Sequence, residues 1–201
     1  MNVYVIGSCR VHGPLRGRPE YVKGVEGYTH TAREAIQRIK FVRGRQLIPN
    51  EIAPYVFLRD RPPAITPAHK LALDSADVVL VEVCSEKNVF HDGHWVNLNY
   101  AEKQGLNIRL RDRRLKTDLS VLVGMVNRLV VVQHVELPGI EPRSRFAAEV
   151  REACGELDIP VFNPSVHVVE SEMLDVNHYK PKVISRMGDR LLEFLKWQLK
   201  A

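Results

Sequence analysis

Four short apolar runs set the strongest limit on how this chain can fold. They cover residues 2–6, 77–83, 129–135 and 159–162. Each is dominated by β-branched and aliphatic residues, which is typical of strands that are covered on both faces. Strands of that kind belong to parallel sheets, because helices pack on each side of such a sheet.

Helical patterns fall between and after these runs. They lie in residues 31–43, 67–75, 115–126 and 144–157, and in a last segment that begins near Pro181. Thr31 and Glu34 have the spacing of a capping box, which marks a helix start. The alternation of strands and helices predicts an α/β protein, specifically a flavodoxin-like three-layer α/β/α sandwich around a central, mostly parallel sheet.

The length of the chain favours one domain over residues 1–201. With 201 residues and 45% hydrophobic content, the chain can bury one substantial core, whereas two full domains would be small. Two segments lack a clear periodic pattern: residues 47–67 contain five prolines, and residues 86–104 are polar and aromatic. Both are predicted to be irregular connections, and 86–104 should border the cleft, since it follows a strand at its carboxyl end.

Charge and cysteine content exclude several classes of protein. The net charge of +5 fits a basic protein without a special partner, and it also fits one with an anionic, phosphate-bearing partner. The basic run at 109–116 is predicted to be a solvated helix face; if functional, it would hold the phosphates of an acyl carrier or a nucleic acid. No aromatic residues interrupt that run, so single-stranded nucleic acid is not the favoured partner. Three widely spaced cysteines fit neither a disulfide framework nor a zinc ribbon.

The sequence carries no mark of export or of a membrane span. The first residues, MNVYVIGSCR, lack a basic leader with a long apolar stretch, and no apolar run is long enough to cross a bilayer. The expected compartment is the cytoplasm.

Two segments carry candidate chemistry. Ser8 directly follows the first strand and Gly7, which places it at the carboxyl edge of the sheet, where ligands bind. Asp175 and His178 have the spacing Asp-x-x-His just before the last helix. A histidine can take a serine proton, and a carboxylate can fix the histidine tautomer. Taken alone, Gly7-Ser8 also fits a turn in which the serine only caps a helix.

Together these segments resemble the SGNH or GDSL hydrolase superfamily, which carries a serine after the first strand and Asp-x-x-His near the end. The first block reads Gly-Ser-Cys here and is similar to branches associated with polysaccharide acyl modification. The resemblance implies a doubly wound α/β sandwich, Ser8 as nucleophile, His178 as general base and Asp175 as its orienting partner.

The middle blocks of that family match in part. The resemblance implies an oxyanion-hole glycine, for which Gly27 is the nearest match. The family's asparagine position falls on Glu86, so Ser85 or Asn88 would have to donate instead. Cys9 is a rival nucleophile, since a thiolate at a helix N-terminus would be activated.

Other residues add substrate contacts rather than a metal or cofactor. His134 ends the third strand, where it reaches either the substrate or only the rim of the core. His91 and His94 have an aspartate between them but no evident third ligand, so a turn is favoured over zinc. No Gly-x-Gly-x-x-Gly follows the first strand, so no dinucleotide cofactor is expected.

Two functions follow from these features. The first is serine-dependent acyl transfer by an esterase or an O-acyltransferase, with an acylated saccharide, a small ester or a phosphate-bearing acyl donor as substrate. The alternative is a non-catalytic protein of the same fold that binds an anionic or saccharide ligand, with Arg10 and the basic run as its grip.

Overall fold

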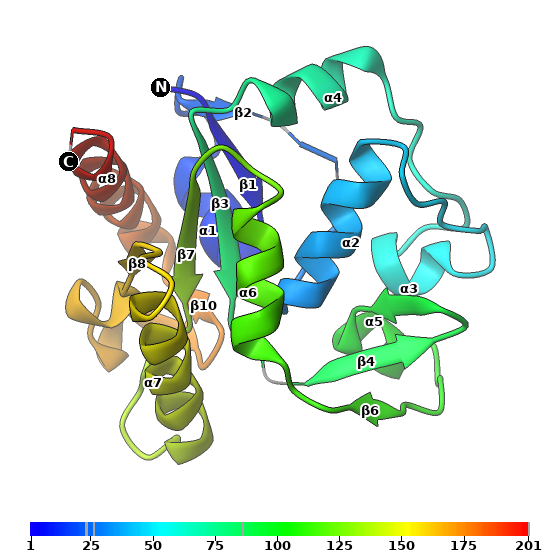
Figure 1. Ribbon diagram of the computed structural model, residues 1–201. Helices are drawn as coiled ribbons and strands as arrows, with labels where there is room; N and C mark the ends of the chain where they lie inside the picture. Colours follow the sequence, from blue (N-terminus) through cyan, green and yellow to red (C-terminus); the bar gives the residue numbers. More distant parts are fainter. Residues whose placement is uncertain (23, 26, 86, 201) are drawn as a thin grey trace.

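A five-stranded parallel sheet forms the centre of the structure (Figure 1). The structure is a computed structural model that describes residues 1–22, 24–25, 27–85 and 87–200. The strands are β1 (Val3–Ile6), β2 (Tyr21–Val22), β3 (Val78–Val83), β7 (Leu129–Gln133) and β8 (Val161–Phe162). Their order, β2-β1-β3-β7-β8, is the flavodoxin-like order and confirms the predicted fold class.

Helices cover both faces of this sheet, as Figure 1 shows. One face packs against α2 (Ala32–Val42), α6 (Leu115–Val123) and α7 (Glu141–Gly155), and the other against α1 (Cys9–Leu15) and α8 (Pro181–Gln198). Strand residues alternate between the two cores: in β1, Tyr4 and Ile6 face α2, whereas Val3 and Val5 face α8. Burial on both faces explains why the strands read as continuous apolar runs.

The predicted start of α2 is confirmed in detail. The Thr31 hydroxyl accepts a hydrogen bond from the Glu34 N–H at 3.2 Å, and the Glu34 carboxylate accepts one from the Thr31 N–H, also at 3.2 Å. The same carboxylate accepts from the N–H of His30 at 2.5 Å. Burial raises the pKa of Glu34 to about 7, while these N–H donors hold it down.

The segment 86–104 is more ordered than predicted. It contains β4 (Asn88–His91), β5 (His94–Val96) and α5 (Leu98–Lys103), and β4 also pairs with β6 (Leu110–Arg111). A tight turn at Asp92-Gly93, with φ of +43° and +78°, joins β4 to β5. Asp-Gly turns of this kind match the twist of a hairpin. Glu86 lies outside the described residues.

Smaller differences from the sequence-based assignment lie at chain segments with weak local signals. The proline-rich connection contains the short helix α3 (Ala53–Phe57), and α4 (Pro67–Asp74) follows it. Strand β2 and the short hairpin of β9 (Met173–Asp175) and β10 (His178–Tyr179) were not predicted. Within the described ranges, every helix is too short or too polar to cross a lipid bilayer. One domain over 1–201 stays a prediction.

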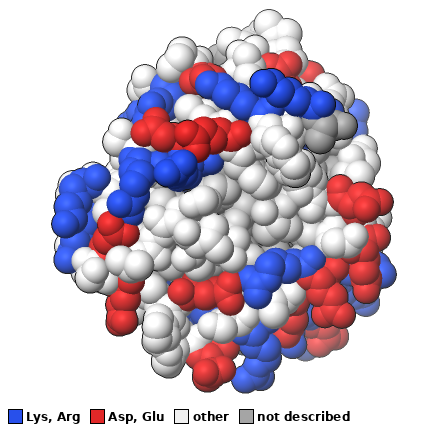
Figure 2. Space-filling model, turned by 90° about the vertical axis from the view of Figure 1, so that its left-hand side faces the viewer, with Lys and Arg blue, Asp and Glu red and all other residues white. Residues whose placement is uncertain are grey.

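Charges of both signs are mixed on the face that carries α8. Figure 2 shows Lys and Arg beside Asp and Glu around a broad uncharged area. Charged residues of α8 form ion pairs, including Asp189 with Arg18 at 2.8 Å and Arg186 with Glu172 at 2.6 Å. This face therefore presents no patch of a single sign, although the chain is basic overall.

Candidate functional site

A pocket of about 940 Å³ opens at the carboxyl edge of the sheet, next to the point where strand order reverses between β1 and β3. We call it the Ser8 pocket. Its walls come from the ends of β1, β3 and β7, from residues 84–85, 87 and 98–103, from α7 and from the β9–β10 hairpin. The lining residues are Ser8, Cys9, Arg10, Tyr28, His30, Leu58, Cys84, Ser85, Lys87, Leu98, Asn99, Tyr100, Glu102, Lys103, His134, Arg143, Asn177 and His178. The edge where ligands bind in such folds thus carries most of the predicted site residues.

Ser8 caps α1 and also lines this pocket. Its hydroxyl accepts a hydrogen bond from the Arg10 N–H at 3.4 Å, so the capping interpretation holds alongside any chemical role. The Ser8 N–H donates to the Glu82 carboxylate at 2.6 Å. That N–H is therefore not available to an oxyanion in this arrangement.

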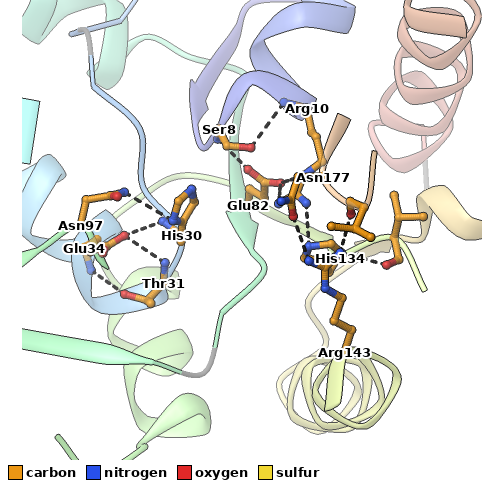
Figure 3. Close-up of polar contacts among 12 residues, drawn as sticks. Ser8, Arg10, His30, Thr31, Glu34, Glu82, Asn97, His134, Arg143 and Asn177 are labelled. Carbon is orange, nitrogen blue, oxygen red and sulfur yellow. Dashed lines mark hydrogen bonds and ion pairs between the residues drawn. The ribbon is translucent and has the colours of Figure 1, made fainter. Parts of the chain in front are cut away.

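Glu82 and Arg10 form a buried ion pair beneath Ser8, as Figure 3 shows. The Arg10 guanidinium donates to Glu82 through Nε at 2.8 Å and through a second nitrogen at 2.7 Å. The side chain of Glu82 is 1% exposed and that of Arg10 is 7% exposed. Burial opposes the charge on Glu82, yet Arg10 and the Ser8 N–H hold the pKa of this carboxyl below its usual value.

His134 completes this chain of contacts. Its Nδ1 contacts the Val135 carbonyl at 2.8 Å, which fixes the proton on Nδ1 and leaves Nε2 to accept from Arg10 at 2.6 Å. Burial, followed by the charge of Arg10, lowers the pKa of His134 to about 3. His134 is therefore neutral at pH 7, and both ring nitrogens already have partners.

Asp175 and His178 form a hydrogen-bonded pair at the mouth of the pocket. The His178 Nδ1 lies 2.9 Å and 2.8 Å from the two carboxylate oxygens of Asp175. The hydrogen bond to His178 and one from the Asn177 N–H lower the pKa of Asp175. With Nδ1–H directed at the carboxylate, Nε2 keeps its lone pair and has the tautomer of a general base.

Arg143 of α7 anchors the turn between Asp175 and His178. Its guanidinium donates to the Val176 carbonyl and, at 2.9 Å, to the Asn177 side-chain oxygen. Figure 3 shows Arg143 and Asn177 beside His134. Arg143 thus holds this turn on the side of the pocket where Glu82, Arg10 and His134 contact one another.

Ser8 and His178 border one pocket without touching. Among the described residues, no hydrogen bond joins the Ser8 hydroxyl to the His178 ring, although α1 packs against β10. Catalytic hydrogen bonds are often long before substrate binds. Ser8 and His178 therefore line one cavity, and Asp175 is hydrogen-bonded to His178, while no hydrogen bond joins Ser8 to His178.

The other predicted residues lie at varied places. Ser85 lines the Ser8 pocket, where its hydroxyl accepts from the Lys87 N–H at 3.1 Å. Asn88 lies outside it, in a small cavity beside Thr31. Gly27 has φ +114° and lies in a neighbouring pocket; a Cβ there would come 2.7 Å from the Arg38 guanidinium.

Cys9 lines the Ser8 pocket but is not activated. Burial and the nearby Glu82 carboxylate raise the pKa of its thiol, although it stands at the first position of α1. A thiol with a raised pKa is a poorer nucleophile at pH 7 than the thiolate that was expected.

Sequence reasoning missed two residues of this site. Glu82 is a carboxylate inside an apolar strand, and that placement is a signal of a buried partner. His30 lines the pocket, and burial lowers its pKa, so its ring is neutral. Asn97 Nδ2 donates to His30 Nδ1 at 3.4 Å, since the Asn97 oxygen already accepts two N–H bonds. The His30 proton therefore lies on Nε2.

The two histidines of the β4–β5 hairpin make structural contacts. His94 Nδ1 lies 2.7 Å from the Asp92 carbonyl, and His91 packs edge-on against Tyr55. In the described part of the chain, no group of three or more histidine, cysteine or acidic side chains is placed to hold a metal ion.

Comparison with known proteins matches the N-terminal part of the chain, which includes Ser8, to one family. Residues 1–114 match the family described as the TviD N-terminal domain. Over 101 residues, the chain is 31% identical to the Vi polysaccharide biosynthesis protein TviD of Salmonella typhi; the match covers 47% of this chain and 12% of the relative. No solved structure matches the chain.

The matched region includes Ser8, Arg10, His30 and Glu82, whereas Asp175 and His178 lie beyond it. It spans more than half of the 201 residues. The chain is therefore a member of the TviD N-terminal domain family.

Proposed function

We propose that this chain transfers acyl groups to or from a saccharide, with Ser8 as nucleophile, His178 as general base and Asp175 as the residue that orients His178. The observation that carries the proposal is the shared pocket, in which Ser8 faces the same cavity as a hydrogen-bonded Asp175–His178 pair. The saccharide is supported by the relative named as a polysaccharide biosynthesis protein.

The proposed reaction has two balanced steps. His178 Nε2 takes the Ser8 hydroxyl proton while the oxygen attacks the acyl carbon, and the leaving group departs with that proton. An incoming hydroxyl, from water or a sugar, then loses its proton to His178 and takes the acyl group, and the proton returns to Ser8. Water as acceptor makes the protein an esterase, and a sugar makes it an O-acyltransferase.

The oxyanion needs a donor other than the Ser8 N–H, which is bound to Glu82. His30 is the best candidate in the described pocket wall, because its Nε2 carries a proton and its ring is neutral. A preorganised donor in a partly buried site stabilises the charge that develops on the acyl oxygen. His30→Ala should therefore lower kcat more than it raises KM.

A second function is favoured by one observation. The Ser8 N–H is held by a carboxylate. Among the described residues that line the pocket, Lys87, Lys103 and Arg143 are cations in addition to the paired Arg10, and Glu102 is the acid. A cavity of that charge would bind an anionic ligand without any reaction.

Turnover of p-nitrophenyl acetate, with and without a sugar acceptor, separates the two functions. Under the enzyme mechanism, Ser8→Ala and His178→Ala lose about 10³-fold or more in kcat, and Asp175→Ala loses less. Cys9→Ser is the matched control and keeps most of the activity. If wild type and all four variants are equally inert, the binding function replaces the enzyme.

A further inference from the structure

We propose that a second pocket, beside the Ser8 pocket, is the subsite that holds a sugar ring of the substrate. This inference rests on the proposed function and names where the saccharide sits. The second pocket has a volume of about 530 Å³, within the range of small-molecule sites. Four aromatic side chains line it, Tyr21, Tyr28, Phe57 and Tyr100, and we call it the tyrosine pocket.

The two pockets are neighbours. Tyr28, Leu58 and Tyr100 line both of them, and we infer that one ligand occupies both, with one part in the tyrosine pocket and another beside Ser8. Tyr28 and Leu58 at this boundary are 37% and 47% exposed, and their side chains are thus open to a ligand. A ring seated in the tyrosine pocket would carry its acyl group, or its acceptor hydroxyl, toward the serine.

The lining chemistry suits a sugar ring. Tyrosine offers a flat apolar face and a hydroxyl at its edge, and a pyranose has an apolar C–H face bordered by hydroxyls. His12 adds a neutral polar group: burial lowers its pKa to about 4, and its Nδ1 lies 3.0 Å from the Tyr21 hydroxyl. A ligand with both apolar faces and polar edges can satisfy such a wall.

Other ligand classes fit less well. The tyrosine pocket is much larger than a short acyl group needs, and a long acyl chain would lie against the charged guanidinium of Arg16. A phosphate-rich ligand would find one lining cation, Arg16, in the described wall. The saccharide is therefore the occupant that the lining favours.

Saccharide binding by the Ser8→Ala protein tests the subsite without requiring turnover. Chitotetraose, maltotetraose and tetragalacturonate serve as probes, with dissociation constants from calorimetry and contact maps from saturation-transfer NMR. At least one probe should bind, Tyr21→Ala and Tyr28→Ala should weaken it at least tenfold, and Tyr21→Phe should bind within about twofold of the parent. Trp197→Ala is the control, because Trp197 is 63% exposed on α8 and lines neither pocket.

The outcomes separate this inference from the proposed function. If no probe binds, the sugar subsite is wrong, even where Ser8 turns over esters. It is also wrong if neither tyrosine substitution weakens binding although circular dichroism shows that both variants are folded. If octanoate binds instead and the tyrosine variants weaken it, the pocket holds an acyl chain. If a probe binds as predicted but no ester is turned over, the subsite stands and the acyl-transfer function falls.

Discussion

Replacing Arg10 with methionine tests whether the buried ion pair holds the floor of the Ser8 pocket together. Methionine keeps much of the apolar stem but removes the cation beside the Glu82 carboxylate, which is 1% exposed and keeps the hydrogen bond from the Ser8 N–H. Breaking a buried pair from one side costs about 3–5 kcal/mol. An unfolding entropy of about 2.1 cal/mol/K per residue gives roughly 0.4 kcal/mol/K for 201 residues, so Tm should fall by about 7–12 °C.

Calorimetry and urea unfolding measure this loss directly. The matched control is the double variant Arg10→Met with Glu82→Leu, which removes both charges of this pair and should be more stable than Arg10→Met alone. A loss of less than about 1 kcal/mol in Arg10→Met, or a double variant that loses the sum of the two single losses, would contradict a structural role for the buried pair.

The same pair predicts how the loss depends on pH. The pKa of Glu82 is lowered in the folded protein, so its stabilising effect is present above the ordinary carboxyl pKa and is lost as the pH falls through the folded value. In Arg10→Met, burial instead favours the protonated acid. The stability difference between wild type and variant should therefore be largest near pH 7 and shrink on acidification, and a difference that grows toward pH 4 contradicts this.

Three further predictions concern the supports of the site. Thr31→Ala should cost about 1 kcal/mol in urea unfolding because it removes the cap on the Glu34 N–H, whereas Thr31→Ser should cost little; equal losses would contradict the cap. Gly188→Ala should lower stability by about 1–3 kcal/mol despite better helix propensity, since a Cβ would come 2.2 Å from the Pro14 carbonyl; a raised Tm would show that α1 and α8 separate freely. Arg143→Ala should lower kcat about tenfold with part recovered in Arg143→Lys, because it frees the turn that carries His178; unchanged kcat would exclude this positioning role.

The parts of the fold that were predictable from sequence have local signals. The strands β1, β3 and β7 are apolar runs, and α2 and α8 carry a helical apolar period, so each is recognisable without its neighbours. Strand β2 has two residues and exists only by pairing with β1, which no local pattern encodes. The β4–β5 hairpin did have a signal, the Asp92-Gly93 turn, but its strands are short and its histidines suggested another role.

The candidate site also has contacts that were predictable from the sequence and contacts that were not. Asp175 and His178 are three residues apart, so their hydrogen bond follows from one turn and could be predicted. Glu82 and Arg10 are 72 residues apart, and their contact depends on the register of β1 against β3. The sequence placed Ser8 at the sheet edge, but it did not reveal that the Ser8 N–H would be held by a buried carboxylate.

Covalent trapping tests the central claim, that Ser8 is a nucleophile activated by His178. A fluorophosphonate reacts with an activated serine, and mass spectrometry of the digested protein locates the adduct. We predict one adduct on the peptide that contains Ser8, absent in Ser8→Ala, strongly slowed in His178→Ala and retained in Cys9→Ser. Absence of any adduct in the wild-type protein, or an adduct that persists in Ser8→Ala, would contradict the account.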